Sequence, residues 1–161
     1  MREIKISFTI QVYENFDSFT EVEKTMLKKA IQARRNAYAR YSKFRVGSAV
    51  LMKNGMKIPG SNQENAVLPI GICAERVALG YASHNYPDVP VVALALSTEK
   101  DPCEDELPVF PCGSCRQAIA EQESKFGSKI KLFIMGNNNK TYVIDSVSDI
   151  LPFAFTGKLL E

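Results

Sequence analysis

Three cysteines and one glutamate have the residue types and the spacing of a metal-assisted reaction centre. Cys73 and Glu75 stand in Cys73-Ala74-Glu75, and Cys112 and Cys115 follow in Pro111-Cys112-Gly113-Ser114-Cys115. Both segments fall at predicted helix starts, where the helix dipole and free backbone N–H groups lower the pKa of a thiol and favour metal binding. Three thiolates suit zinc, and three protein ligands leave its fourth tetrahedral position open to water. Glu75 would stand beside that water as a general acid and base.

Two other interpretations of the cysteines remain open. The CxxC pair could be a redox motif, although the βαβ context of a thioredoxin-like motif is missing. A closed structural zinc site would need a fourth ligand, for which the candidates are Cys103 and the sole histidine, His84. If the helix after Cys73 runs on to His84, the two residues lie roughly 16 Å apart, so His84 is a poor ligand. Cys103 could close a four-cysteine site in a zinc-stabilised binding module, but the carboxylate would then have no role.

The composition is that of one ordinary domain. The chain has 161 residues, of which 45% are hydrophobic, enough to bury a single core. A formal charge of +2 gives no electrostatic reason to expect a nucleic acid or a membrane surface as partner. No uncharged stretch reaches the roughly 20 residues that cross a bilayer, and charges near the N-terminus argue against a signal peptide. We therefore expect a single cytoplasmic domain, residues 1–161, that takes a free small molecule.

Hydrophobic periodicity and turn residues predict the elements that position the four residues. Strands are expected at residues 4–12, 46–52, 56–60, 91–96, 131–135 and 141–145. Helices are expected at residues 21–38, 73–81 and 115–126, with a short one near 148–151. The segment 62–72 is expected to be irregular, and residues 97–108 form a charged loop. This alternation predicts a three-layer α/β/α domain around a central mixed β-sheet.

The cysteine segments belong to a longer series of sequence blocks. In chain order the others are Ala37-Tyr38-Ala39-x-Tyr41-Ser42-x-Phe44-x-Val46-Gly47, Gly60-x-Asn62-x-Glu64-Asn65-Ala66 and Leu151-Pro152-x-x-Phe155. The series resembles the cytidine deaminases, in the small homotetrameric branch with three cysteine ligands. It covers residues 20–155 and leaves residues 1–19 as an N-terminal extension. The resemblance implies zinc-dependent hydrolytic deamination of cytidine and deoxycytidine, a reaction of pyrimidine salvage.

The resemblance also implies a role for each matching residue. Glu75 is the catalytic proton shuttle, and one Zn²⁺ per subunit is held by Cys73, Cys112 and Cys115, whose thiolates accept hydrogen bonds from Arg76. The residues implied in substrate binding are Phe44 against the pyrimidine ring, Asn62 and Glu64 at the ribose 3′-hydroxyl, backbone groups of Ala74 and Cys112 at the base, and Ala66 and Phe155 in a neighbouring subunit's pocket. The active sites are thus expected at the subunit interfaces of a homotetramer.

Two residues bear on the substrate. The Glu64 charge would repel a 3′-phosphate, which favours free nucleosides over nucleotides and nucleic acids. Leu68 stands where the family usually has Tyr, near the 5′ end of the sugar. This departure favours an alternative, a deaminase of the same fold for another amino-pyrimidine nucleoside such as a nucleoside antibiotic, whereas the intact Asn62 and Glu64 pair disfavours it.

Overall fold

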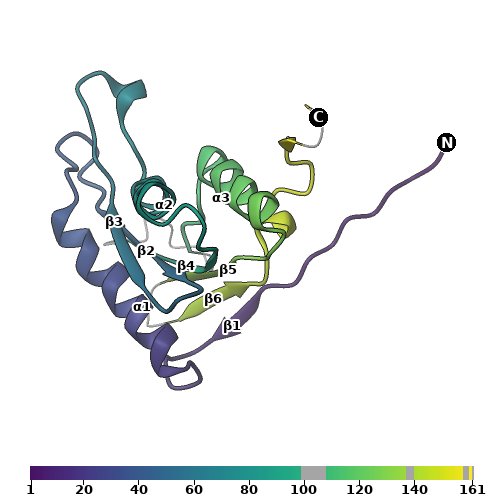
Figure 1. Cartoon of the computed structure of the whole chain (residues 1–161), viewed down its shortest axis with the longest axis horizontal. Helices are drawn as coiled ribbons and strands as arrows, with labels where there is room; N and C mark the ends of the chain where they lie inside the picture. Colours follow the sequence, from purple (N-terminus) through teal and green to yellow (C-terminus); the bar gives the residue numbers. More distant parts are fainter. Residues whose placement is uncertain (99–107, 137–139, 158–159, 161) are drawn as a thin grey trace.

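Six strands form one mixed sheet in the computed structural model, which describes residues 1–98, 108–136, 140–157 and 160 (Figure 1). The strands are β1 (Gln11–Tyr13), β2 (Val46–Met52), β3 (Lys57–Ser61), β4 (Val91–Thr98), β5 (Lys131–Met135) and β6 (Thr141–Ile144). Their order across the sheet is β1-β6-β5-β4-β2-β3. Strands β4 and β5 are parallel, and the other neighbouring pairs are antiparallel. The mixed sheet that was predicted is therefore confirmed.

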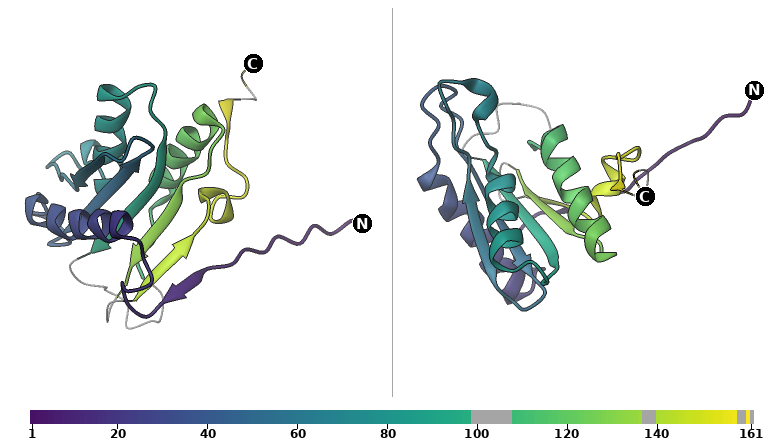
Figure 2. Two further views of the ribbon diagram at one scale, coloured as in Figure 1. Left: turned by 60° about the horizontal axis from the view of Figure 1, so that its bottom comes forward. Right: turned by 45° about the horizontal axis from the view of Figure 1, so that its top comes forward.

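Helices cover both faces of this sheet. Helix α1 (Glu21–Ala33) lies on one face, and α2 (Ala74–Asn85) and α3 (Gly113–Phe126) lie on the other (Figures 1 and 2). Successive strand residues point to opposite faces, so Ala49 packs with the α1 residues, while Val50 packs with those of α2 and α3. Two hydrophobic clusters result, one on each side of the sheet. This arrangement confirms the three-layer α/β/α fold.

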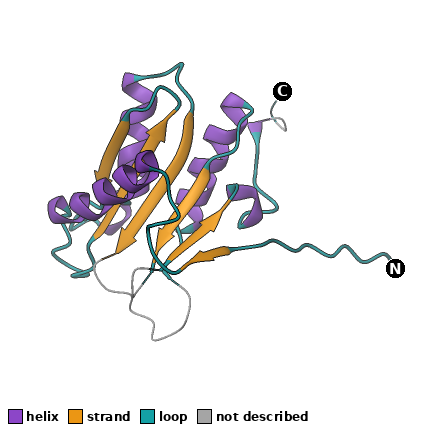
Figure 3. Ribbon diagram, turned by 90° about the horizontal axis from the view of Figure 1, so that it is seen from below, coloured by secondary structure: helices purple, strands orange, loops and turns teal. Residues whose placement is uncertain are grey.

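The N-terminal strand is shorter than the sequence predicts. Apolar residues alternate over 4–12, but the ladder with β6 begins at Gln11 and pairs three residues, and residues 1–10 lie outside the sheet (Figure 3). Alternation indicates which side of a strand is apolar, whereas a strand forms only where a neighbour offers backbone partners. Strand β6 is four residues long and offers few. The predicted strand over 4–12 is therefore wrong for residues 4–10.

The first helix also ends earlier than predicted. It begins at the predicted capping box, where Thr20 and Glu23 bond reciprocally, but stops at Ala33 and continues as a 3₁₀ helix, Arg34–Asn36. Tyr38 then leaves the helical path because its N–H donates to the Asn62 carbonyl and its carbonyl accepts from Glu64 N–H. The helix predicted over 21–38 is thus too long, because a tertiary contact competes for the backbone of its last turn. Among the described residues, no helix has the length and apolar character to cross a membrane.

Several other boundaries shift by a few residues. The helix predicted over 73–81 runs to Asn85. Burial of Ala82 stabilises the additional turn, and Pro87, two residues after the last helical residue, cannot continue it. The helix predicted over 115–126 begins at Gly113. Strand β4 extends to Thr98, and the hairpin turn has Gly55 at φ 86°, as Asn-Gly predicts. The segment 62–72 is mostly irregular and contains a short 3₁₀ helix, Leu68–Ile70, while the predicted C-terminal helix is a 3₁₀ turn, Val147–Asp149.

Gly60 allows α2 to approach β3 closely. A Cβ atom there would lie 2.6 Å from the Ala78 nitrogen and would also strike the Ala74 carbonyl oxygen. We expect Gly60→Ala to push the start of α2 outward, to destabilise the fold by about 1–3 kcal/mol and to weaken zinc retention. Thermal unfolding and zinc content check this expectation.

Gly80 provides a matched control on the same helix. A Cβ atom at Gly80 meets nothing within 4 Å, so Gly80→Ala should stabilise α2 by about 0.5–1 kcal/mol. Equal melting temperatures for Gly60→Ala and Gly80→Ala would show that α2 can accommodate a side chain at position 60, which would contradict the steric argument.

Candidate active site

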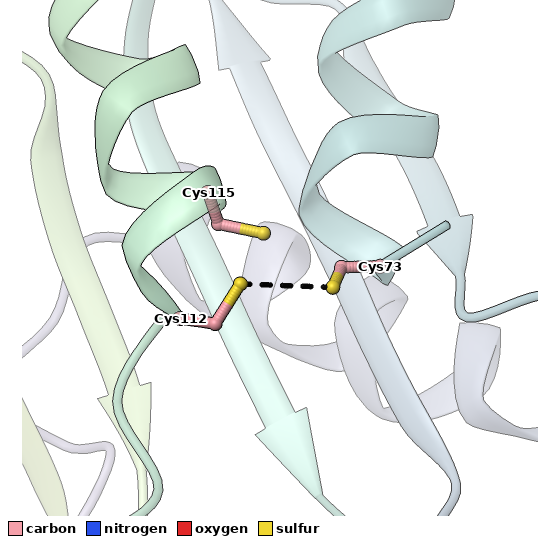
Figure 4. Close-up of side chains that lie close together, drawn as sticks. All are labelled: Cys73, Cys112 and Cys115. Carbon is pink, nitrogen blue, oxygen red and sulfur yellow. Dashed lines mark hydrogen bonds between the residues drawn. The ribbon is translucent and has the colours of Figure 1, made fainter. Parts of the chain in front are cut away.

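The segment that contains Cys73 and the segment that contains Cys112 and Cys115 bring three sulfurs together at the starts of α2 and α3. Cys73 is the N-cap residue of α2, Cys112 is the N-cap residue of α3, and Cys115 lies in the first turn of α3. The three side chains point toward one another (Figure 4), and their Sγ atoms all lie within 4.8 Å of one another. No other group of three or more potential metal ligands comes as close within the described part of the chain.

The distances and the chemistry of this group fit zinc. Zn–S bonds of about 2.3 Å at tetrahedral angles place two sulfurs roughly 3.8 Å apart, and the Cys73 and Cys112 sulfurs lie 3.8 Å apart. Cys115 is fully buried, Cys73 is partly buried and Cys112 is exposed, so the group opens to solvent on one side. His84 lies exposed in the last turn of α2 and is not part of the group. Cys103 falls outside the described residues.

The cysteine thiols of this group differ in pKa, so they do not lose their protons equally. The hydrogen bond from Cys115 lowers the pKa of Cys73 to about 6, and a bond from Cys112 and the charge of Arg76 contribute further. The hydrogen bond to Cys73, followed by burial and the Glu75 charge, raises the pKa of Cys115. One sulfur of the group is therefore ready to bind a cation as a thiolate near neutral pH.

Glu75 lies in the first turn of α2, beside the sulfurs. Its side chain is 4% exposed. Burial raises the pKa of the Glu75 carboxyl to about 6, with the Cys73 charge acting in the same direction and its own backbone N–H opposing. A carboxyl group with a pKa near the working pH can both take and give a proton.

A cavity of about 280 Å³ joins this carboxyl group to the predicted substrate residues. Its volume is close to the lower end of small-molecule sites, which span about 300–1,000 Å³. The sequence-predicted residues along its wall are Phe44, Asn62, Glu64, Cys73, Ala74, Glu75 and Cys112. Residues from the loops that precede β2 and follow β3 thus meet the starts of α2 and α3 at one site.

Asn62 and Glu64 also hold the loop that carries Phe44. The Asn62 Oδ1 atom accepts from Val46 N–H at 2.9 Å, and Nδ2 donates to the Phe44 carbonyl at 3.0 Å. A Glu64 oxygen accepts from Tyr41 N–H at 2.7 Å. Each side chain keeps hydrogen-bonding capacity beyond these bonds. Both therefore shape the cavity wall, a role that sequence reasoning missed because it considered only their bonds to a ligand.

Besides the buried Cys115, four residues to which the resemblance draws attention do not line the cavity of their own chain. Ala66 is exposed, and Leu68 and Phe155 expose 72% and 59% of their surfaces. The Phe155 carbonyl accepts from Gln117 Nε2 at 2.6 Å, which fixes its backbone against α3. Arg76 is exposed and acts on Cys73 through its charge, and no hydrogen bond from it to a sulfur is found among the described residues.

Six further residues of the cavity wall were not predicted as site residues: Ser42, Val46, Leu96, Thr98, Val109 and Phe110. Val109 and Phe110 directly precede Pro111, so their proximity to the cysteine segment was an available signal. Leu96 and Thr98 stand at the end of β4. Their place in the site depends on the pairing of β4 with β2 and could not be read from local sequence.

The comparisons with known proteins agree with this geometry. The model for the cytidine and deoxycytidylate deaminase zinc-binding region matches residues 20–127. A cytidine deaminase of Halalkalibacterium halodurans is 42% identical over 134 residues, 83% of this chain and 93% of that protein. One of Sporosarcina psychrophila is 40% identical over 142 residues, 88% and 96% of the two chains. The crystal structure of cytidine deaminase from Burkholderia pseudomallei superposes with a TM-score of 0.70 at 32% identity, covering 85% of this chain and 100% of that one.

The matched region and the site coincide. Residues 20–127 include the three sulfurs, Glu75 and the wall residues Phe44, Asn62 and Glu64. The similar chains are covered almost completely, so the likeness extends over the whole fold rather than one motif. This protein is therefore a member of the cytidine and deoxycytidylate deaminase family, which binds zinc.

Proposed function

We propose that the protein is a zinc-dependent hydrolase that removes the 4-amino group of cytidine and deoxycytidine. The products are uridine or deoxyuridine and ammonia. The observation that carries the proposal is a single cavity lined by Glu75, two of the grouped cysteines and an aromatic side chain, Phe44. The names of the relatives at 40–42% identity support the same reaction.

In the proposed reaction, the chain supplies ligands, proton transfer and orientation. Cys73, Cys112 and Cys115 would hold Zn²⁺, and the bound ion would supply a nucleophile at neutral pH by lowering the pKa of water. Glu75 accepts a proton from the attacking water, delivers it to ring N3, and then protonates the departing amine. The water oxygen first adds to C4 as N3 is protonated. Glu75 then moves the remaining proton of that oxygen to the amine, and the bond from C4 to the amine breaks as the C4 carbonyl forms. Phe44 packs against the pyrimidine ring.

The exposed positions of Ala66 and Phe155 support an oligomer. We propose that the single domain, residues 1–161, forms a homotetramer in which these side chains complete the pocket of a neighbouring subunit. Their exposure in one chain is what such a role requires, since a residue that lines a neighbour's pocket must face outward. We also propose that the enzyme works in the cytoplasm and that its reaction belongs to pyrimidine salvage.

The direct test uses purified protein with measured zinc content. Mixed with cytidine, it should produce the ultraviolet absorbance change of deamination, and ammonia should appear in equal amount. A panel of amino-pyrimidine nucleosides run beside cytidine tests the antibiotic alternative. Zinc-loaded protein that turns over another member of the panel but not cytidine would refute the proposed substrate.

The Glu64 carboxylate predicts discrimination against 3′-phosphates. The Ser42 hydroxyl, with the Tyr41 and Ser42 amides, lowers the pKa of Glu64, so this group is charged near neutral pH. We expect kcat/KM for cytidine 3′-phosphate to fall about 10²-fold below that for cytidine, because a phosphate beside a carboxylate is repelled. Glu64→Gln should narrow the difference. Comparable turnover of a cytidine-containing oligonucleotide would contradict the prediction.

A further inference from the structure

The N-terminal arm, residues 1–10, precedes the region that the family model matches. That region begins at residue 20, and the arm leaves the sheet before Gln11, the first residue of β1 (Figures 1 and 3). Every second arm residue from Ile4 onward is apolar. Such alternation gives the arm one apolar side. The question is what that side contacts.

The inner half of the arm lines a groove against the body of the protein. Ile6, Phe8 and Ile10 form one wall of a groove of about 310 Å³. The opposite wall consists of Phe110, Arg116, Asp149, Ile150 and Pro152. Ile10 packs partly on the main hydrophobic cluster, whereas Ile6 and Phe8 are 48% and 51% exposed. Ile4, farther out, is 80% exposed and is not part of this groove.

Phe110 connects this groove to the substrate cavity. It lines the groove and also the cavity that contains Glu75 and Cys112. It directly precedes Pro111 and Cys112 in the chain. Arg116, also in the groove, donates from Nε to the Pro111 carbonyl at 2.8 Å and from Nη1 to the Ile150 carbonyl at 3.0 Å. The backbone after Phe110 is therefore fixed, while Phe110 itself borders both the groove and the cavity.

We propose that Phe8, assisted by Ile6, is a positioning residue for the Phe110 wall of the substrate cavity. The inference rests on the proposed deaminase function. An aromatic ring with water on one side can change rotamer, whereas apolar neighbours on that side restrict it to the position that bounds the cavity. The arm thus sets how well the nucleoside is held, and neither Glu75 nor the cysteines depend on it.

Phe8→Ser tests the proposal. We expect KM for cytidine to rise about fivefold through looser positioning of a wall residue, with kcat and zinc content unchanged. Phe8→Leu, which keeps an apolar side chain in the groove, should restore KM. The matched control is Ile4→Ser, a change of the same kind in the same arm but outside the groove, and it should leave KM at the wild-type value.

A double-mutant cycle links the arm to Phe110. Phe110→Leu should raise KM by itself, and adding Phe8→Ser should then have no further effect, because the ring that Phe8 positions is gone. Additive effects, an unchanged KM in Phe8→Ser, or an equal rise in Ile4→Ser would each overturn the proposal. A change in the mass of the Phe8→Ser assembly, measured by light scattering, would also overturn the proposal, because the arm would then contact another copy of the chain. Wild-type protein that does not turn over cytidine refutes the proposed function instead.

Discussion

Replacing Glu75 by glutamine should lower kcat for cytidine by about 10³- to 10⁴-fold, the range expected when a general acid and base is removed. The amide has nearly the same shape as the carboxyl group but cannot carry the proton between water, ring N3 and the leaving amine. Because Glu75 is buried, a neutral replacement creates no uncompensated charge. Zinc content and melting temperature should therefore stay close to wild type while the absorbance change of deamination almost disappears.

A matched control isolates the position of this carboxyl group. Glu121 is an exposed residue of α3, and Glu121→Gln makes the same chemical change away from the cavity. It should leave turnover unaffected. Near-normal turnover by Glu75→Gln in zinc-loaded protein would refute the proton shuttle, whereas loss of zinc in that variant would mean that Glu75 supports the metal site instead.

Replacing Cys112 by alanine should remove zinc as well as activity. Two of the three sulfurs would remain, and zinc content should fall from about one ion per chain to nearly none after dialysis. Cys112 is the best choice of the three because it is exposed, so its truncation leaves no cavity in the core. Metal analysis and the cytidine assay measure both losses, and the circular dichroism spectrum should show that the fold persists.

Cys103→Ser is the control for this experiment. It removes the fourth thiol of the chain, and if three cysteines suffice to hold the metal, both zinc and turnover should be retained. If Cys103→Ser released zinc instead, the metal would have four cysteine ligands and the open position that the proposed reaction needs would be filled. That result would favour a zinc-stabilised binding module over an enzyme.

Local sequence signals located most elements because their causes are local. The Thr20 and Glu23 capping box fixed the start of α1, and Gly55 fixed the hairpin turn between β2 and β3. The failures share a different cause. The strand predicted over residues 4–12 lacked a long enough neighbour, and the last turn of the helix predicted over 21–38 lost its backbone partners to the Tyr38 contacts. In both cases a segment distant in the sequence decided where the element ends.

The site shows the same division. Residue type and spacing were enough to single out Cys73, Glu75 and the Cys112 pair, because a soft metal and a proton carrier require those side chains whatever the fold. The resemblance added Phe44, Asn62 and Glu64, all of which line the cavity. Neither the residue spacing nor the resemblance predicted that Asn62 and Glu64 also form hydrogen bonds to the loop around Phe44, because these bonds depend on how the loop packs.

The sequence by itself determined the chemistry of this protein: three thiols, a carboxyl group and the helix starts that carry them are local properties of two short segments. Only the tertiary structure decided which sulfurs meet, how deeply Glu75 is buried and that Phe110 separates the substrate cavity from the groove beneath the N-terminal arm. The physical reason is that burial and proximity arise from packing between segments far apart in the chain, and no local pattern encodes them.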